Sequence, residues 1–188
     1  MTKKVFIAGD LHIPSRAKQL LPPFKEILES TTWDYIALTG DLTTKEVLEY
    51  FKQYVSNPSN LIACQGNMDS FNLPERTIFT IDSLRIGVFH GKGIYPRGDI
   101  SQLKEIANEM NVSILLTGHS HQTFCHHDDN HIILNPGTAT GASGGSSWAV
   151  DAGIMVLSIS ENNKTVTLHW HRLINHKLKT TTRTLEIK

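Results

Sequence analysis

Short apolar runs alternate with amphipathic stretches through the first 116 residues. Runs rich in apolar residues, which predict buried strands, occur at 5–8, 35–38, 61–64, 84–89 and 112–116. Between them, apolar residues recur at helical spacing over 20–28, 44–55 and 100–110, which predicts three helices. The run at 77–81 is separated from 84–89 by Asp82 and Ser83, a pair typical of a tight turn, so these two runs predict a hairpin.

The pattern changes to strands and turns after residue 121. Strands are predicted at 123–127 and 131–134, on either side of the turn residues 128–130, and again at 152–159, 165–174 and 177–187. Further turns are expected at 161–163 and 175–176, and the Gly, Ser and Thr residues of 136–147 predict a long loop. The whole chain, 1–188, is therefore expected to form a single domain with an α/β part and an antiparallel β part.

Composition excludes several classes of protein. The chain has 188 residues, of which 39% are hydrophobic, enough for one domain with a substantial core. Lys plus Arg and Asp plus Glu both number 18, so no basic excess indicates nucleic-acid binding. Two cysteines, Cys64 and Cys125, are too few for a disulfide framework. Because neither a signal peptide nor a membrane-spanning run is evident, we expect a cytoplasmic protein without membrane insertion.

Residues that commonly bind metals follow five of the predicted strands. Strand ends on one side of a sheet bring their side chains together, so these residues are expected to converge. Mixed His, Asp and Asn side chains suit manganese, iron, zinc or cobalt better than calcium. Seven ligands exceed one tetrahedral site and fit two ions if one carboxylate bridges them. The candidate metal ligands are Asp10, His12, Asp41, Asn67, His90, His119 and His121.

The series G-D-x-H, G-D, G-N, H-G and G-H-x-H that these residues form resembles that of the calcineurin-like metallophosphoesterases. The resemblance runs from about Val5 to Ile159. It is strongest to the small single-domain branch, which contains phosphodiesterases and a retromer subunit, and above all to that subunit. The fold that it implies is a four-layer α-β-β-α metallophosphoesterase sandwich, in which two mixed sheets are flanked by helices.

The resemblance also implies roles for the seven residues. Asp10, His12, Asp41 and His121 would hold one divalent ion, and Asp41, Asn67, His90 and His119 the second. Mn²⁺ and Zn²⁺ are the expected ions, and Asp41 would bridge them. A hydroxide between the ions would attack a phosphoester in line. The implied function is a metal-dependent phosphoesterase, a phosphodiesterase rather than a monoesterase, with Asp41, Asn67 and His90 also assigned to catalysis.

Two positions depart from the pattern of family phosphatases. Many of these have His directly after the motif Asn, where this chain has Met68, so either a slower enzyme or one that acts on better leaving groups is expected. Relatives often read H-G-H where this chain has His90, Gly91 and Lys92. Lys92 has two interpretations, a contact to a substrate phosphate or a solvated loop residue, and the sequence favours neither.

A scaffold protein is the alternative function. The retromer-subunit resemblance implies a helical protein partner bound over the face that carries the metal site. The loop containing Ile94 and Tyr95 follows His90 and is expected to expose apolar groups there. Retention of Asp41 and Asn67 favours the enzyme, whereas the detailed resemblance favours the scaffold, and the two functions are compatible. The other histidines, at 126, 127, 131, 169, 171 and 176, are interpreted as turn or strand-surface residues.

Overall fold

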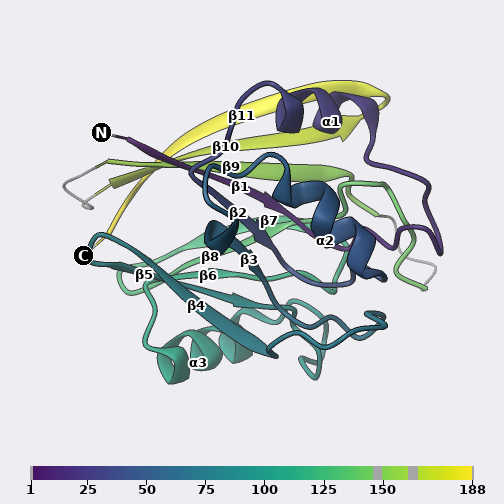
Figure 1. Ribbon diagram of the computed structural model, residues 1–188. Helices are drawn as coiled ribbons and strands as arrows, with labels where there is room; N and C mark the ends of the chain where they lie inside the picture. The colour runs from purple at the N-terminus through teal and green to yellow at the C-terminus, as the bar shows by residue number, and fades with distance from the viewer. Residues whose placement is uncertain (1, 146–149, 161–164, 188) are drawn as a thin grey trace.

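Two β-sheets and three α-helices make up the structure, a computed structural model that describes residues 2–145, 150–160 and 165–187 (Figure 1). The predicted turn at 161–163 and the end of the predicted loop, 146–147, lie outside these residues. No helix within the described ranges is long and apolar enough to cross a membrane. In chain order the elements are β1 (Lys3–Ala8), α1 (Pro22–Glu29), β2 (Tyr35–Leu38), α2 (Lys45–Lys52), a 3₁₀ turn (Pro58–Asn60), β3 (Leu61–Ala63), β4 (Arg76–Ile81), β5 (Leu84–Phe89), α3 (Ile100–Met110), β6 (Ile114–Leu116), β7 (Thr123–His127), β8 (Ile132–Pro136), β9 (Gly153–Ile159), β10 (Thr165–Ile174) and β11 (Lys177–Glu186).

Each sheet combines parallel and antiparallel pairs. The first has the strand order β11-β10-β9-β1-β2-β3, and the second has the order β4-β5-β6-β8-β7. Strands β1, β2 and β3 are parallel to one another, as are β5, β6 and β8. The remaining strands pair antiparallel with their neighbours. The parallel strands are short and apolar because both of their faces are covered.

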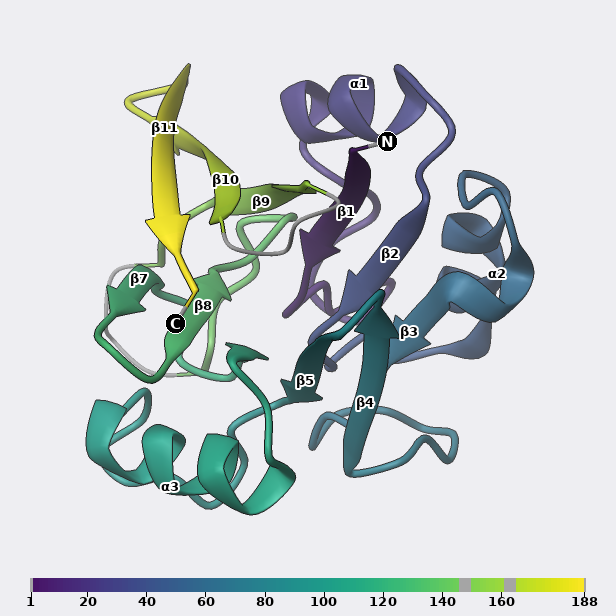
Figure 2. The same ribbon diagram turned by 90° about the vertical axis from the view of Figure 1, so that its left-hand side faces the viewer.

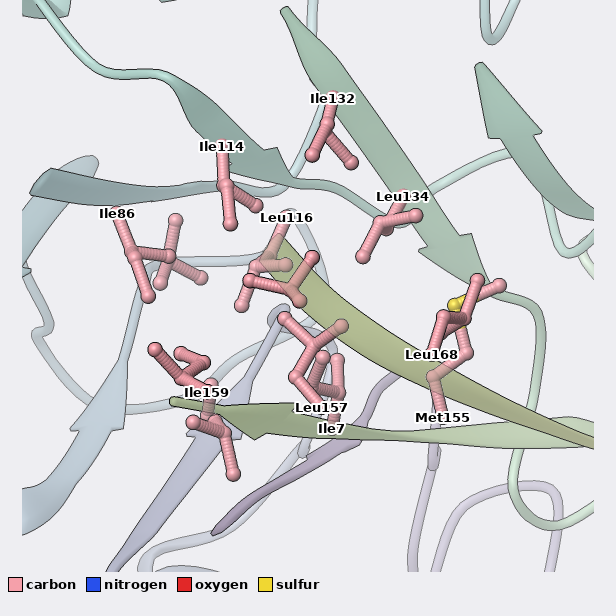
Figure 3. Close-up of a cluster of buried hydrophobic side chains, with 14 of the residues drawn as sticks. Ile7, Ile86, Ile114, Leu116, Ile132, Leu134, Met155, Leu157, Ile159 and Leu168 are labelled. Atoms are coloured by element: carbon pink, nitrogen blue, oxygen red, sulfur yellow. The ribbon is translucent and has the colours of Figure 1, made fainter. Parts of the chain in front are cut away.

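The main core lies between the two sheets (Figure 3). Side chains from the two inner faces point toward one another and exclude water from the space between them. Strand β1 shows the alternation that this packing requires, since Val5 and Ile7 face the other sheet whereas Phe6 and Ala8 face the helices. The labelled side chains of this layer are Ile7, Ile86, Ile114, Leu116, Ile132, Leu134, Met155, Leu157, Ile159 and Leu168.

Helices cover the outer face of each sheet. Helices α1 and α2 pack on the first sheet through Phe24, Leu28 and Phe51, and the Phe51 ring lies 6.2 Å from that of Phe6. Helix α3 packs on the second sheet through Leu103 and other apolar residues. Viewed in Figures 1 and 2, α1 and α3 lie at opposite ends of the stack of layers. The layer order is therefore α-β-β-α, the predicted fold class.

The predicted elements agree with the structure to within a few residues, with local differences. Val55 was assigned to the second helix, but α2 ends at Lys52 and Val55 instead pairs with Trp33 in an isolated bridge. Pro136 belongs to β8 rather than to the loop that was expected to begin there. Thr44 is the N-cap residue of α2, at the start of the predicted helical range 44–55.

Candidate metal centre

The carboxyl ends of β1, β2 and β3 in one sheet and of β5 and β6 in the other carry the predicted metal ligands. Each residue sits in the loop that directly follows its strand. Gly66 allows the loop after β3 to approach the loop after β2, because a Cβ atom there would overlap the backbone nitrogen of Asp41. The candidate centre is thus assembled from two sheets.

Four of the predicted ligands form a compact buried group. One potential ligand atom from each of Asp10, His12, Asp41 and His121 lies within 4.8 Å of all the others. His12 Nε2 lies 3.2 Å from His121 Nε2 and 3.4 Å from Asp41 Oδ2, and His121 Nε2 lies 3.5 Å from Asp10 Oδ1. None of the four residues is more than 3% exposed.

The other three predicted ligands extend this group on one side. His90 Nε2 lies 3.5 Å from Asp41 Oδ2 and 3.1 Å from Asn67 Oδ1. The rings of His90 and His119 meet edge to face, with 4.9 Å between their centroids. Asp41 therefore lies between the two groups of residues, the place that a bridging carboxylate would need.

Backbone carbonyl groups orient two of the histidines. His90 Nδ1–H donates to Thr39 O at 2.8 Å, and His121 Nδ1–H donates to Ala142 O at 2.7 Å. In each ring this leaves Nε2 facing the carboxylates, an arrangement typical of metal-binding histidines. Two ligand atoms about 2.1 Å from one ion, at angles of about 90–110°, lie about 3.0–3.4 Å apart. The observed separations fit a divalent ion.

The carboxylates are held in an environment that favours a cation. Burial raises the pKa of Asp10 despite the opposing charges of His90 and His121. Burial alone would also raise the pKa of Asp41, but the hydrogen bond and charge of His90, together with the Met68 N–H, lower it to about 2. For His90, burial lowers the pKa, but the Asp41 and Asp10 carboxylates outweigh it and raise the pKa. A bound cation would stabilise the ionised form of Asp10, whose pKa burial otherwise raises.

Two other histidines are neutral at ordinary pH. Burial lowers the pKa of His12 to about 4 and that of His119 to about 4, with further lowering by nearby positive charges that include Arg16 and Arg97, respectively. Neutral imidazole is the form that binds a metal. Each arginine also donates to the backbone of the loop after Thr140, Arg16 to Ser143 O at 2.6 Å and Arg97 to Gly144 O at 3.2 Å.

The backbone is left-handed at most of the predicted ligands. The φ angles of five of them are positive, between 49° and 68°. This conformation costs a residue with a side chain on the order of 1 kcal/mol, and such strain is concentrated at functional sites. The five residues are Asp10, His12, Asp41, His119 and His121.

Asp69 organises the loops but was not among the predicted site residues. Its carboxylate accepts backbone N–H groups of Thr43 and Gly66 at 2.7 Å each and of Asp41 at 3.2 Å. Only its position two residues after Asn67 hinted at a role. Arg16 and Arg97 were missed as well, although Arg16 lies four residues after His12 and its backbone N–H donates to His12 O at 2.8 Å. No local sequence signal places Arg97 near His119.

One expectation about the surface was wrong. Ile94 was expected to be exposed, but it is 8% exposed because it packs in the cluster beneath α3. Its neighbour Tyr95 is 86% exposed. Lys92 is exposed as well.

The histidines that were not predicted as metal ligands form hydrogen bonds away from the candidate centre. His126 Nε2 lies 3.1 Å from Asp128 Oδ2, His127 bonds to Glu186 O, and His169 and His171 each pair with a threonine of β11. His131 was interpreted as a turn residue, yet it is 7% exposed and bonds to Asn108.

Comparison with known proteins identifies the family. The model of the calcineurin-like phosphoesterase superfamily domain matches residues 4–162. A probable metallophosphoesterase of Methanocaldococcus jannaschii is 37% identical over 139 residues, which are 74% of this chain and 69% of that protein. The chain belongs to the calcineurin-like phosphoesterase superfamily.

Solved structures of Vacuolar Protein Sorting 29 (Vps29) share the fold closely. The protein from Cryptosporidium parvum superimposes with a TM-score of 0.90 at 28% identity, covering 98% of both chains. Vps29 of Entamoeba histolytica, solved as a Zn²⁺ complex, has a TM-score of 0.85 at 26% identity and covers 96% of this chain and 98% of its own. Vps29 of Chaetomium thermophilum in complex with a cyclic peptide has a TM-score of 0.79 at 25% identity, covering 98% and 96%.

Proposed function

We propose that this protein is a dinuclear metal-dependent phosphoesterase that acts on phosphodiesters. The observation that carries the proposal is the buried group of Asp10, His12, Asp41 and His121, whose ligand atoms lie within 4.8 Å of one another. Burying two carboxylates close together costs free energy, which a cation held between them would offset. Membership of a phosphoesterase superfamily and the Zn²⁺ complex of a structural relative support the same reading.

Each of the seven residues has a place in this proposal. Asp10, His12, Asp41 and His121 would hold one ion, and Asn67, His90 and His119 would hold the second together with Asp41. Mn²⁺ and Zn²⁺ both suit such mixed nitrogen and oxygen ligands. When bound, the two ions would activate water for attack on phosphorus and neutralise charge on the phosphate.

Arginines on two sides of the centre would position the substrate. The charge of Arg16 lowers the pKa of His12, and the charge of Arg97 lowers the pKa of His119. Each arginine also donates a hydrogen bond to a backbone carbonyl group. A guanidinium group binds phosphate oxygens in a planar, two-point contact. We therefore assign phosphate binding to Arg16 and Arg97.

The residue after Asn67 cannot protonate a leaving group. Met68 follows Asn67, is 40% exposed and has no titratable side chain. Leaving groups that are already acidic should therefore depart fastest, and aryl diesters should react faster than alkyl diesters. The variant Met68→His should raise turnover on alkyl diesters more than on aryl diesters.

An assay on metal-loaded protein tests the proposal. The protein would be loaded with Mn²⁺ or Zn²⁺ and supplied with bis(4-nitrophenyl) phosphate, 4-nitrophenyl phosphate and an alkyl diester. We expect two ions per chain by elemental analysis and preferential hydrolysis of the aryl diester. Asp41→Asn should lower hydrolysis about 100-fold or more, whereas His126→Ala should leave it unchanged. Equal losses in both variants would contradict the assigned roles.

A scaffold function is the second candidate, and exposed Tyr95 favours it. Tyr95 follows His90 by five residues, is 86% exposed, and provides an aromatic group of the kind enriched at protein interfaces. The likeness to Vps29 supports a helical partner of the retromer type. Tyr95→Asp should weaken that partner and spare metal content and hydrolysis, whereas Ile94→Asp would destabilise the fold. Loss of partner binding in Tyr95→Asp, with no phosphoester hydrolysis by the metal-loaded protein, would favour the scaffold over the enzyme.

A further inference from the structure

Three cationic side chains share one face of the β10–β11 hairpin. The register pairs Arg172 with Lys179, Trp170 with Thr181 and Leu168 with Arg183. Because side chains directly opposite in an antiparallel pair lie on the same face, and alternate residues of one strand share that face, all six belong to one surface. Leu168 and Trp170 belong to the core between the sheets, so this is the inner face of the first sheet.

The two arginines converge on the Trp170 ring. The guanidinium carbon of Arg172 lies 4.5 Å from the ring centroid and that of Arg183 lies 5.5 Å from it. Arg183 lies near Cys125 of β7, where it opposes the burial that raises the pKa of that thiol, and His127 of β7 bonds to Glu186 O. The cluster thus lies where the edge strands β7 and β11 of the two sheets approach each other (Figure 2). Arg183 and Lys179 are exposed, so the cluster is open to solvent.

Two donors in this cluster have no acceptor. Trp170 Nε1 and Arg172 Nε are both buried and make no hydrogen bond to any described residue. Trp170 as a whole is 7% exposed. A buried N–H group without a partner is costly. Because both groups are donors, the missing partner must be an acceptor.

The charges in the cluster are also unbalanced. Arg172 and Lys179 lie directly opposite each other, and like charges in that relation destabilise a sheet. Neither of them, nor Arg183, forms an ion pair with a carboxylate of the described part of the chain. Other lysine and arginine side chains of the described residues lack such a partner as well, but in this cluster three of them lie on one face of one hairpin. The chain as a whole has a net charge of zero, so this local excess is not a general property of the molecule.

We propose that Arg172, Arg183 and Lys179 form a second binding site, which takes a phosphate-type oxyanion. Two guanidinium groups supply the planar donors that phosphate oxygens accept, and Lys179 adds a third positive charge that favours a dianion over a carboxylate. The Thr181 hydroxyl lies between them on the same face. The site shares no residue with the metal centre and does not rest on the proposed phosphoesterase function.

The indole N–H resonances of the full chain provide the test. Chelator-treated protein, in which the metal centre cannot bind phosphate through metals, would be titrated with inorganic phosphate at constant ionic strength. We expect a saturable shift of the Trp170 resonance, assigned with Trp170→Phe. Trp33 is an internal reference, because its Nε1–H already donates to Leu28 O at 2.9 Å. The oxyanion that binds could be free phosphate or the phosphate group of an organic phosphomonoester. Glycerol 3-phosphate, titrated in parallel, distinguishes these ligands. Tighter binding than that of inorganic phosphate indicates an organic phosphomonoester, and equal binding indicates the free anion.

Three variants, one within the cluster and two controls outside it, test whether the response is specific. Arg172→Gln should weaken phosphate binding about tenfold or more, because it removes a charged donor. Arg76→Gln is the matched control, since Arg76 also lies over an aromatic ring, 5.5 Å from that of Phe89, but is paired with Glu109. Asp41→Asn should respond like the unaltered chain. The proposal is overturned if chloride produces the same shift, if phosphate produces none at tens of millimolar, or if the two arginine variants behave alike.

Discussion

At the scale of single residues, the candidate centre depends on backbone groups as much as on side chains. Carbonyl groups of Thr39 and Ala142 set which nitrogen of His90 and His121 faces inward. The motif residues provide the candidate ligand atoms, whereas the surrounding backbone groups orient those atoms. A change that leaves every predicted ligand in place can therefore still disable the centre.

Asp69 allows a direct test of this point. Asp69→Ala removes the acceptor of three backbone N–H groups, and a typical hydrogen bond contributes about 0.5–1.5 kcal/mol net. We expect the free energy of unfolding to fall by about 2–4 kcal/mol and metal affinity to fall about 10–100-fold. Urea unfolding and metal titration measure the two effects. Glu75→Gln, an exposed change on the same loop, should alter neither, and unchanged metal affinity in Asp69→Ala would refute the positioning role.

At the scale of elements, the turn between β7 and β8 is tied to α3 by one carboxylate. Asp128 accepts Lys104 Nζ of α3 at 2.7 Å, His126 Nε2 at 3.1 Å and the N–H groups of Asn130 and His131. The lysine contact, followed by the other three, holds the pKa of Asp128 well below its ordinary value. The hairpin and the helix are thus joined at the surface as well as through the core.

The stability conferred by Asp128 should depend on pH. Because its pKa is lower in the folded chain than in the unfolded chain, the stabilisation is complete above the ordinary value of about 3.9 and declines as the pH falls below it. Asp128→Asn should lower Tm by the same amount at pH 7 and pH 5, and by a smaller amount near pH 3. Thermal unfolding followed by circular dichroism checks this. A difference that grows toward pH 3 would contradict the assignment.

The elements were largely predictable, but their arrangement was not. A buried strand requires apolar residues within its own short segment. The apolar runs 5–8 and 35–38 therefore sufficed to predict strands there. Which strands share a sheet depends on pairings between distant segments, such as β1 with β9, that periodicity does not encode. The two-sheet architecture was predicted from the family motifs and not from periodicity. Burial of Ile94 was missed for the same reason, because it depends on where α3 packs.

At the scale of the whole molecule, the candidate centre connects the two sheets. Asp10, Asp41 and Asn67 follow strands of the first sheet, whereas His90 and His119 follow strands of the second. Ions held by both sets would bind the folded chain and not the unfolded chain. Metal binding is therefore expected to stabilise the complete sandwich rather than one loop.

The size of this stabilisation can be predicted. An ion present at about 100 times its Kd adds about 2.7 kcal/mol, which corresponds to a rise in Tm of about 5–10 °C for a chain of this length. We expect Mn²⁺ or Zn²⁺ to produce such a rise in calorimetry with a single transition. Asp41→Asn should abolish the rise and His169→Ala should retain it. Separate transitions, with only one moved by metal, would argue against a centre that spans both sheets.

The layer of Ile7, Leu116, Leu157 and their neighbours between the sheets has a further consequence for metal choice. This close-packed layer acts as a spacer, because the volume of its side chains sets how far apart the two sheets stand. The same spacing separates the ligands contributed by one sheet from those contributed by the other. Ions differ in radius by tenths of an ångström, so in the proposed metal centre the thickness of a hydrocarbon layer remote from the ligands would help to select which ion fits. Under that proposal, residues that contact no ligand atom would contribute to metal specificity.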